Sequence, residues 1–325
     1  MTADGLAPLV AAVAAVIGTA VLAALRWERW RVPARAAVAV AALLSLATAA
    51  VLQVNRMTET YSSLSGGRPA AAATGSEMLT VRVPGPASGL TLTMYVYLPA
   101  AYRTGHDRYP VIEALHGYPG SPRTWLRRLD VQSVLDGEIA AGRMAPTVVL
   151  FPFQTPDPLL DTECTDLVGG PRTETFLTSD VPAYAETHWR VRTDRAGWAL
   201  TGYSAGAFCA TDLLLRHPTQ YAAAASLSGY TSPGIRIGDG SENTLHNTSW
   251  RLRHLPPPNV ALWLGWAADD RGTRRASTQL ARLSRAPLAV TTAVVAHGGH
   301  SDAVWRQMEP VAFDWLSAHL ARPQR

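Results

Sequence analysis

Short apolar runs rich in β-branched and aromatic residues recur from residue 78 to the end of the chain and predict β-strands. The first two, 79–83 and 90–98, flank a Gly/Pro turn and are expected to form an antiparallel hairpin. Helical stretches separate most of the later runs, and this alternation favours an α/β fold with a mostly parallel sheet and helices on both faces. The later predicted strands are 111–115, 147–151, 197–201, 222–227, 260–265 and 288–295.

Two longer apolar runs precede this region, at 6–25 and 36–54, and each has the length of a transmembrane helix. The segment between them, 26–35, carries four arginines against one glutamate, with two tryptophans suited to the headgroup region. The positive-inside rule puts this loop in the cytoplasm and the rest of the chain outside the cell. A cleavable signal peptide is the main alternative, but the first run lacks a preceding basic segment and a second run follows it. A buried helical hairpin is a further alternative to two transmembrane helices.

The predicted organisation is a membrane anchor at 1–54, a linker at 55–77 and an α/β domain at 78–325. The linker prediction rests on a stretch rich in Ser, Gly and Ala without hydrophobic periodicity. A chain of 325 residues is long enough for one large α/β domain in addition to the two membrane helices.

Residues 202–206 read G-x-S-x-G between a predicted strand and a helix-like run from Ala207 to about Arg216. This is the sequence of a nucleophile elbow, in which a sharp turn presents the serine hydroxyl above the sheet. The two flanking positions are glycine because a Cβ atom there would collide with its neighbours. The pattern therefore makes Ser204 the candidate nucleophile, with the first amides of the following helix directed at the same point.

Later strand ends supply candidates for an acid and a base, since parallel sheets place their sites beyond the carboxyl ends of strands. Asp269 and Asp270 follow strand 260–265, and either is able to orient a histidine. Asp270 is favoured for its reach, and the other aspartate is expected to cap the helix that starts near Thr273. His300 follows the last strand on a glycine-containing loop and is favoured over His297 as the base, because it directly precedes the helical stretch 302–320.

A second donor for negative charge is expected where strand 111–115 ends, in the turn 116–120. We expect the backbone N–H groups of Tyr118 and Ala205 to form an oxyanion hole. An ordinary Gly/Pro turn is the alternative interpretation, and His116 is expected to be structural.

From about residue 78 onward the chain resembles the esterase family that includes the antigen 85 mycolyltransferases and esterase D. The elbow, the turn at His116 and the loop 299–301 carry this resemblance, together with 173–182, which looks like the helix that antigen 85 proteins place before the nucleophile strand. It implies an α/β-hydrolase fold, a serine nucleophile and ester substrates. Two features differ from antigen 85: the acid candidates are aspartates rather than a glutamate, and 118–121 lacks the Arg and Asp expected for gripping trehalose.

Composition excludes several other kinds of chemistry. All 29 basic residues are arginine, so Schiff-base and P-loop lysines are excluded. The net charge is +4, and the sequence has no dense basic tract apart from the segment 26–35. No nucleic-acid partner is therefore expected. No H-x-x-x-H or C-x-x-C pattern is present, and neither a metal nor another cofactor is expected. Cys164 and Cys209, the two cysteines, are expected to pair in an oxidising compartment, the alternative being two free thiols.

The sequence thus predicts a membrane-tethered, extracytoplasmic serine esterase or acyltransferase that works through an acyl-enzyme. Its expected partner is a small ester or acyl donor, with lipids and cell-envelope glycolipids included. The alternatives are a catalytically silent binding protein on the same fold and a serine peptidase. The pattern leaves open the acyl chain, the acceptor and the oligomeric state.

Overall fold

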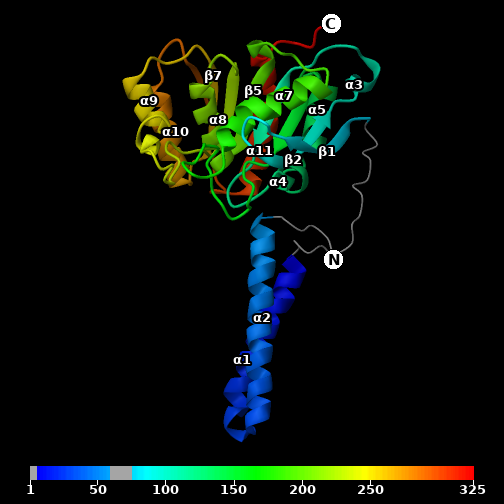
Figure 1. Cartoon of the computed structure of the whole chain (residues 1–325), viewed down its shortest axis with the longest axis vertical. Helices are drawn as coiled ribbons and strands as arrows, with labels where there is room; N and C mark the ends of the chain where they lie inside the picture. Colours follow the sequence, from blue (N-terminus) through cyan, green and yellow to red (C-terminus); the bar gives the residue numbers. More distant parts are fainter. Residues whose placement is uncertain (1–5, 59–74) are drawn as a thin grey trace. The chain divides into compact units, whose positions relative to one another are not determined.

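The computed structural model describes residues 6–58 and 75–325 (Figure 1). It divides into two compact units, Met1–Ala70 and Ala71–Arg325. The first contains α1 (Leu6–Arg26), a short 3₁₀ turn (Trp27–Arg29) and α2 (Val32–Thr58). Both helices are long and apolar enough to cross a membrane, a test of length and composition that signal sequences also meet.

The second helix differs from its predicted bounds, because it begins at Val32 rather than at residue 36 and continues to Thr58. The arginine-rich loop is correspondingly shorter than predicted. Most of the predicted linker, 59–74, lies outside the described residues.

The second unit is built on an eight-stranded sheet with the order β1-β2-β4-β3-β5-β6-β7-β8 (Figure 1). β1 and β2 form the predicted antiparallel hairpin, β2 also pairs antiparallel with β4, and all other pairs are parallel. The prediction of an α/β fold with a mostly parallel sheet is confirmed. The strands are β1 (Glu77–Pro84), β2 (Thr91–Leu98), β3 (Val111–Leu115), β4 (Val148–Pro152), β5 (Trp198–Tyr203), β6 (Ala223–Leu227), β7 (Ala261–Ala267) and β8 (Ala289–Val295).

Helices cover both faces of the sheet, and two separate apolar cores lie beneath them. One core includes buried side chains of α7, α8, α9 and α10, and the other includes those of α4, α5 and α11. The segment 173–182, which was expected to be helical, contains a π turn at Phe176–Asp180, and the helix continues beyond it to His188. The helices are α3 (Ala101–Thr104), α4 (Arg123–Arg127), α5 (Val131–Ala140), α6 (Thr173–Thr175), α7 (Val181–His188), α8 (Ala205–Arg216), α9 (Thr248–His254), α10 (Arg271–Leu283) and α11 (Asp302–His319), and short 3₁₀ turns lie at Arg195–Gly197 and Ser241–Asn243.

The central strands read as continuous apolar runs because both of their faces are covered. Every residue of β3, β4, β5, β6 and β7 is buried. Since β3, β5, β7 and β8 run parallel, their carboxyl ends meet at one edge of the sheet. The segments containing the predicted site residues all leave the sheet at that edge.

One strand carries a buried acid. Glu113 of β3 is fully buried, and the Tyr221 hydroxyl donates to its Oε2 at 3.2 Å. Burial raises the pKa of this carboxyl from 4.5 to about 8. It is therefore protonated in the folded chain at neutral pH.

Glu113 is expected to make stability fall as pH rises from about 4.5 to about 8. In this window the unfolded carboxyl is ionised while the folded one keeps its proton, so unfolding releases a proton and is favoured by higher pH. Glu113→Gln removes this titration and should be more stable than wild type by on the order of 4 kcal/mol above pH 8, with little difference near pH 4.5. Urea unfolding of both proteins across this range measures the difference. A difference that does not change with pH would contradict the assignment.

Candidate active site

Ser204 lies in a strained turn between β5 and α8. Its φ of 56° is in the left-handed region that residues with a side chain rarely adopt. A Cβ atom at Gly202 would lie 2.2 Å from the Gly206 carbonyl oxygen, and one at Gly206 would lie 2.3 Å from the Leu115 carbonyl oxygen. Both glycines are therefore required, as the collision argument predicted. The helix begins at Ala205, two residues earlier than expected, so its first amide adjoins the serine.

Ser204, His300 and Asp270 form one hydrogen-bonded chain. His300 Nε2 lies 2.8 Å from Ser204 Oγ, and its Nδ1 lies 2.9 Å from Asp270 Oδ2. The three residues come from the ends of β5, β7 and β8, so the parallel strands bring them together. The rings of Trp305 and His300 pack edge to face, with the centroids 5.2 Å apart. His297, the alternative base, is exposed on the preceding part of the loop.

The two aspartates have different partners. Asp270 contacts His300 and also caps α10, since its Oδ1 accepts from the Thr273 amide at 3.3 Å. Burial raises the pKa of the Asp270 carboxyl, but the hydrogen bonds from Thr273 and His300 outweigh this and hold the pKa below its ordinary value. It is thus an anion at neutral pH.

The expectation that the other aspartate would cap the helix was wrong, because α10 begins at Arg271 and Asp270 itself is in position to cap it. Asp269 instead accepts from the backbone N–H groups of Gly298 and Gly299, at 3.0 and 2.9 Å. These two bonds lower the pKa of the Asp269 carboxyl. They also fix the loop that carries His300.

The turn after β3 packs directly against the elbow. A Cβ atom at Gly117 would lie 2.8 Å from Tyr203 Cε2 and 3.2 Å from Ser204 Cβ, so glycine at this position permits the close approach. Tyr118 and Ala205 both line the small cavity at this point. Within the described part of the chain, neither of their backbone N–H groups donates to a protein acceptor. Two N–H groups left unengaged at the elbow are a feature that an oxyanion hole requires.

Gln154, which the sequence analysis missed, holds this turn in place. It follows β4, and its side chain accepts from the His116 N–H and donates to the His116 carbonyl oxygen. Burial lowers the pKa of His116 from 6.5 to about 4, so its ring is neutral and Nδ1 donates to the Gly117 carbonyl oxygen at 2.9 Å. The hydrogen bonds of His116 are thus to Gln154 and Gly117, which fits a structural role. The sequence feature that could have pointed to Gln154 is its position just beyond the end of a predicted strand.

Cys164 and Cys209 are disulfide-bonded, which confirms the predicted pairing. The bond joins the 161–166 loop to the helix that follows Ser204. Glu163 and Cys164 both have positive φ, at 45° and 56°. Burial, together with the Asp161 carboxylate, raises the pKa of the Glu163 carboxyl well above its ordinary value, and the Tyr230 hydroxyl donates to it.

The cavity beside the elbow is small, about 10 Å³, and is closed on one side by this loop. It has room for about one water molecule and none for an acyl chain. His300 is exposed, so a substrate would approach Ser204 from the His300 side. Among the described residues no cluster of three or more His, Cys, Asp or Glu side chains is arranged to hold a metal ion.

Removing the disulfide should destabilise the second unit. The bond closes a loop of 45 residues, for which the chain-entropy relation gives a contribution of about 4 kcal/mol. The double variant Cys164→Ala, Cys209→Ala should therefore unfold at a lower urea concentration, as followed by tryptophan fluorescence. Wild type should show the same shift on reduction, and its thiols should resist alkylation until then. Equal midpoints for the oxidised wild type and the variant would contradict this.

A comparison with known protein families bears on this geometry. Residues 86–323 match the family described as "Putative esterase". The chain belongs to this esterase family. The match covers β2 to β8, the elbow and the three residues of the hydrogen-bonded chain, and it confirms the resemblance found in the sequence.

Two curated bacterial proteins are similar to this chain in sequence. An uncharacterised protein of Corynebacterium glutamicum is 25% identical over 240 residues, which are 69% of this chain and 56% of that protein. An esterase of Mycobacterium tuberculosis is 28% identical over 137 residues, which are 42% of this chain and 29% of that protein. The chain therefore spans only part of the length of these relatives.

Solved structures share the fold at lower identity. A ferulic acid esterase superposes with a TM-score of 0.65 at 20% identity, covering 75% of this chain and 99% of its own. An S-formylglutathione hydrolase from Agrobacterium tumefaciens also has a TM-score of 0.65, at 14% identity, covering 77% and 98%. A fluorophosphonate-binding serine hydrolase of Staphylococcus aureus has a TM-score of 0.60 at 15% identity, covering 74% and 98%. These likenesses establish the α/β-hydrolase fold of the second unit.

Proposed function

We propose that the chain is a membrane-tethered serine esterase or acyltransferase whose triad is Ser204, His300 and Asp270. The observation that carries the proposal is the unbroken hydrogen-bonded chain from Asp270 through His300 to Ser204 Oγ. Membership of an esterase family supports ester substrates over peptides. The complete constellation argues against a silent binding protein, which would be expected to lack one member.

In the proposed mechanism, His300 Nε2 takes the proton of Ser204 as Oγ attacks the ester carbonyl carbon. Asp270 stabilises the resulting imidazolium through Nδ1. The N–H groups of Tyr118 and Ala205 hold the negative oxygen of the tetrahedral intermediate. The intermediate expels the alcohol, which takes the proton from His300, and leaves an acyl-serine.

Water, or an acceptor alcohol, then attacks the acyl-serine with His300 again as base, and Ser204 is released. Hydrolysis and transfer use the same groups and differ only in the incoming nucleophile. The exposed position of His300 leaves room for either. The relatives named as esterases suggest carboxylic esters of small molecules as the first substrates to examine.

Covalent labelling of the full chain by a fluorophosphonate probe tests the proposal, followed by p-nitrophenyl esters of increasing acyl length with and without acceptor alcohols. Labelling together with turnover of at least one ester supports it. A correctly folded chain that is neither labelled nor active would refute it.

The proposed tether consists of α1 and α2, with the arginine-rich turn between them in the cytoplasm. Arg26, Arg29, Arg31 and Arg35 cluster at the junction of the two helices. This topology places the second unit outside, in an oxidising environment that is compatible with the disulfide. An ester substrate within the cell envelope would then be accessible to Ser204.

A fusion of alkaline phosphatase after Arg325 is expected to be active in a bacterial host, because that enzyme folds only outside the cytoplasm. A green fluorescent protein fused at the same place and exported in the same way should remain dark. The opposite pair of results would overturn the proposed topology, and release of the domain in soluble form would indicate a cleaved signal instead.

A further inference from the structure

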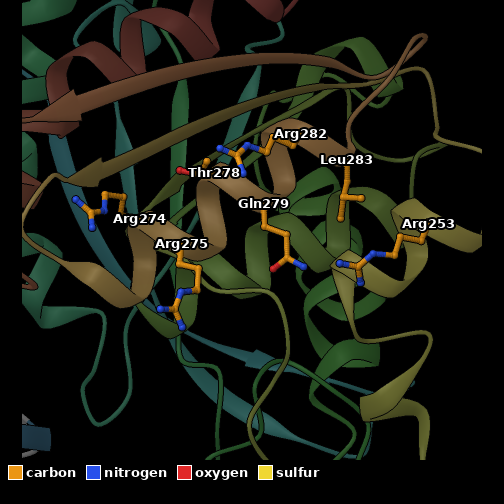
Figure 2. A pocket seen from close by; sticks show the side chains of 7 residues that line it. All are labelled: Arg253, Arg274, Arg275, Thr278, Gln279, Arg282 and Leu283. Carbon is orange, nitrogen blue, oxygen red and sulfur yellow. The ribbon is translucent and has the colours of Figure 1, made fainter.

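An arginine-lined groove lies between α9 and α10, on residues other than those of the proposed triad, and has a volume of about 630 Å³. Figure 2 shows Arg274, Arg275 and Arg282 extending from α10 and Arg253 from α9, with Gln279 between Arg275 and Arg253. Its volume falls within the usual range for small-ligand sites. No acidic residue lines it.

These four arginines are exposed and have no carboxylate partner among the described residues. Some other arginines of the same unit do have carboxylate partners, as Arg143 has Glu138 and Arg216 has Glu174. Guanidinium groups are never neutral at physiological pH, so those around the groove repel one another. A bound anion would relieve that repulsion.

The helix itself also favours an anion. The sequence of α10 contains no acidic residue, and Arg271, Arg274 and Arg275 lie near its N-terminal end, where the helix dipole is positive. Arg271 and Arg275 are four positions apart, a spacing at which like charges destabilise a helix. Asp269 and Asp270 supply two carboxylates beside this end of α10, against the four arginines that the helix carries, so the helix keeps an excess of positive charge.

The walls of the groove are held rigidly. Arg285 donates to the carbonyl oxygens of Leu252 and Leu255 at the end of α9, at 2.7 and 3.4 Å, and so ties α9 to the segment after α10. Leu252 and Leu280 anchor the two helices in the core. Thr278 and Gln279 add polar groups that no described residue engages.

We propose that this groove binds a ligand bearing phosphate groups. A guanidinium group donates two parallel hydrogen bonds to two oxygens of a phosphate. Several guanidinium groups around one groove therefore favour a doubly charged phosphate over a singly charged carboxylate. Two sources share this chemistry, the headgroup of an anionic phospholipid and a soluble phosphate ester. The site is separate from the proposed triad and does not depend on its activity.

The test uses the full chain in neutral-detergent micelles at low salt, titrated calorimetrically with glycerol 3-phosphate and with dihexanoylphosphatidylglycerol. Saturable binding is expected, and it should weaken as salt is added. Tighter binding of the lipid identifies the headgroup as the source, whereas equal or weaker binding identifies the soluble ester. Dihexanoylphosphatidylcholine and malonate serve as the zwitterionic and dicarboxylate controls.

The double variant Arg275→Gln, Arg282→Gln should bind at least tenfold more weakly, while Arg275→Lys should retain part of the affinity because it keeps the charge but loses the fork. Arg236→Gln, which removes an exposed arginine elsewhere, is the matched control and should bind like wild type. Thermal unfolding checks that each variant is folded. Absence of saturable binding, equal binding by the double variant, or malonate binding as tight as phosphate would overturn the proposal.

Discussion

Ser204→Ala is expected to abolish ester hydrolysis and fluorophosphonate labelling. Alanine keeps the Cβ atom and therefore the strained turn, but it removes the oxygen that lies 2.8 Å from His300 Nε2. In serine hydrolases, loss of the nucleophile lowers kcat by about 10⁶-fold, so only a residual rate from the oxyanion donors and substrate binding should remain. Steady-state kinetics with a p-nitrophenyl ester measures the loss.

Ser301→Ala provides a matched control for this variant. Ser301 lies beside His300, and its hydroxyl bonds to the Gly298 carbonyl oxygen rather than to the nucleophile. This variant should still be labelled. If Ser204→Ala kept its labelling while remaining folded, the nucleophile would have to be another residue and the proposed mechanism would be wrong.

Asp270→Asn should lower kcat by roughly 10⁴-fold, the loss seen when the acid of a serine protease triad is replaced by its amide. The substituted amide does not hold His300 in the tautomer that accepts the serine proton, and it provides no charge for the imidazolium. Asparagine is itself a good helix cap, so α10 should keep its N-terminal bond to Thr273 and the fold should be preserved. The loss should therefore appear in kcat, with an unchanged unfolding midpoint.

Asp269→Asn is the informative comparison because it changes the neighbouring residue in the same way. Its amide oxygen is able to keep one of the two loop bonds, to Gly298 or Gly299, and the other is lost. Loss of one such hydrogen bond should lower the rate about tenfold if its whole free-energy cost goes into displacing His300. A larger effect from Asp269→Asn than from Asp270→Asn would move the role of the acid to Asp269.

The strands and the elbow were predictable because local chemistry dictates them. Strands covered on both faces are predominantly apolar, as 111–115 and 222–227 are, and these runs and the edge run 288–295 match the observed strands to within one residue at either end. Gly202 is determined by sterics within a few residues of Ser204, whereas Gly206 is required by the close approach of the Leu115 carbonyl oxygen at the end of β3. Helix ends were less well predicted, since α2 begins four residues early and the 173–182 segment contains a π turn.

Tertiary structure alone decided between Asp269 and Asp270. The two residues are adjacent and chemically identical, and they differ only in which part of the loop after β8 they face. The role of Gln154 was likewise revealed only by the tertiary structure. Its side chain contacts the turn at His116, 38 positions away in the chain, and so joins two strand ends.

The sequence by itself determined the α/β order of elements, the elbow at Ser204, the order of Ser204, Asp270 and His300 along the chain, and the apolar N-terminal helices. Each of these depends on short-range patterns of apolar spacing, glycine sterics or hydrophobic length. Only the tertiary structure decided which aspartate faces His300, what holds the Tyr118 turn, and which arginines share a groove. Those outcomes depend on distances between segments far apart in the chain, which the packing of helices on the sheet sets and no local pattern encodes.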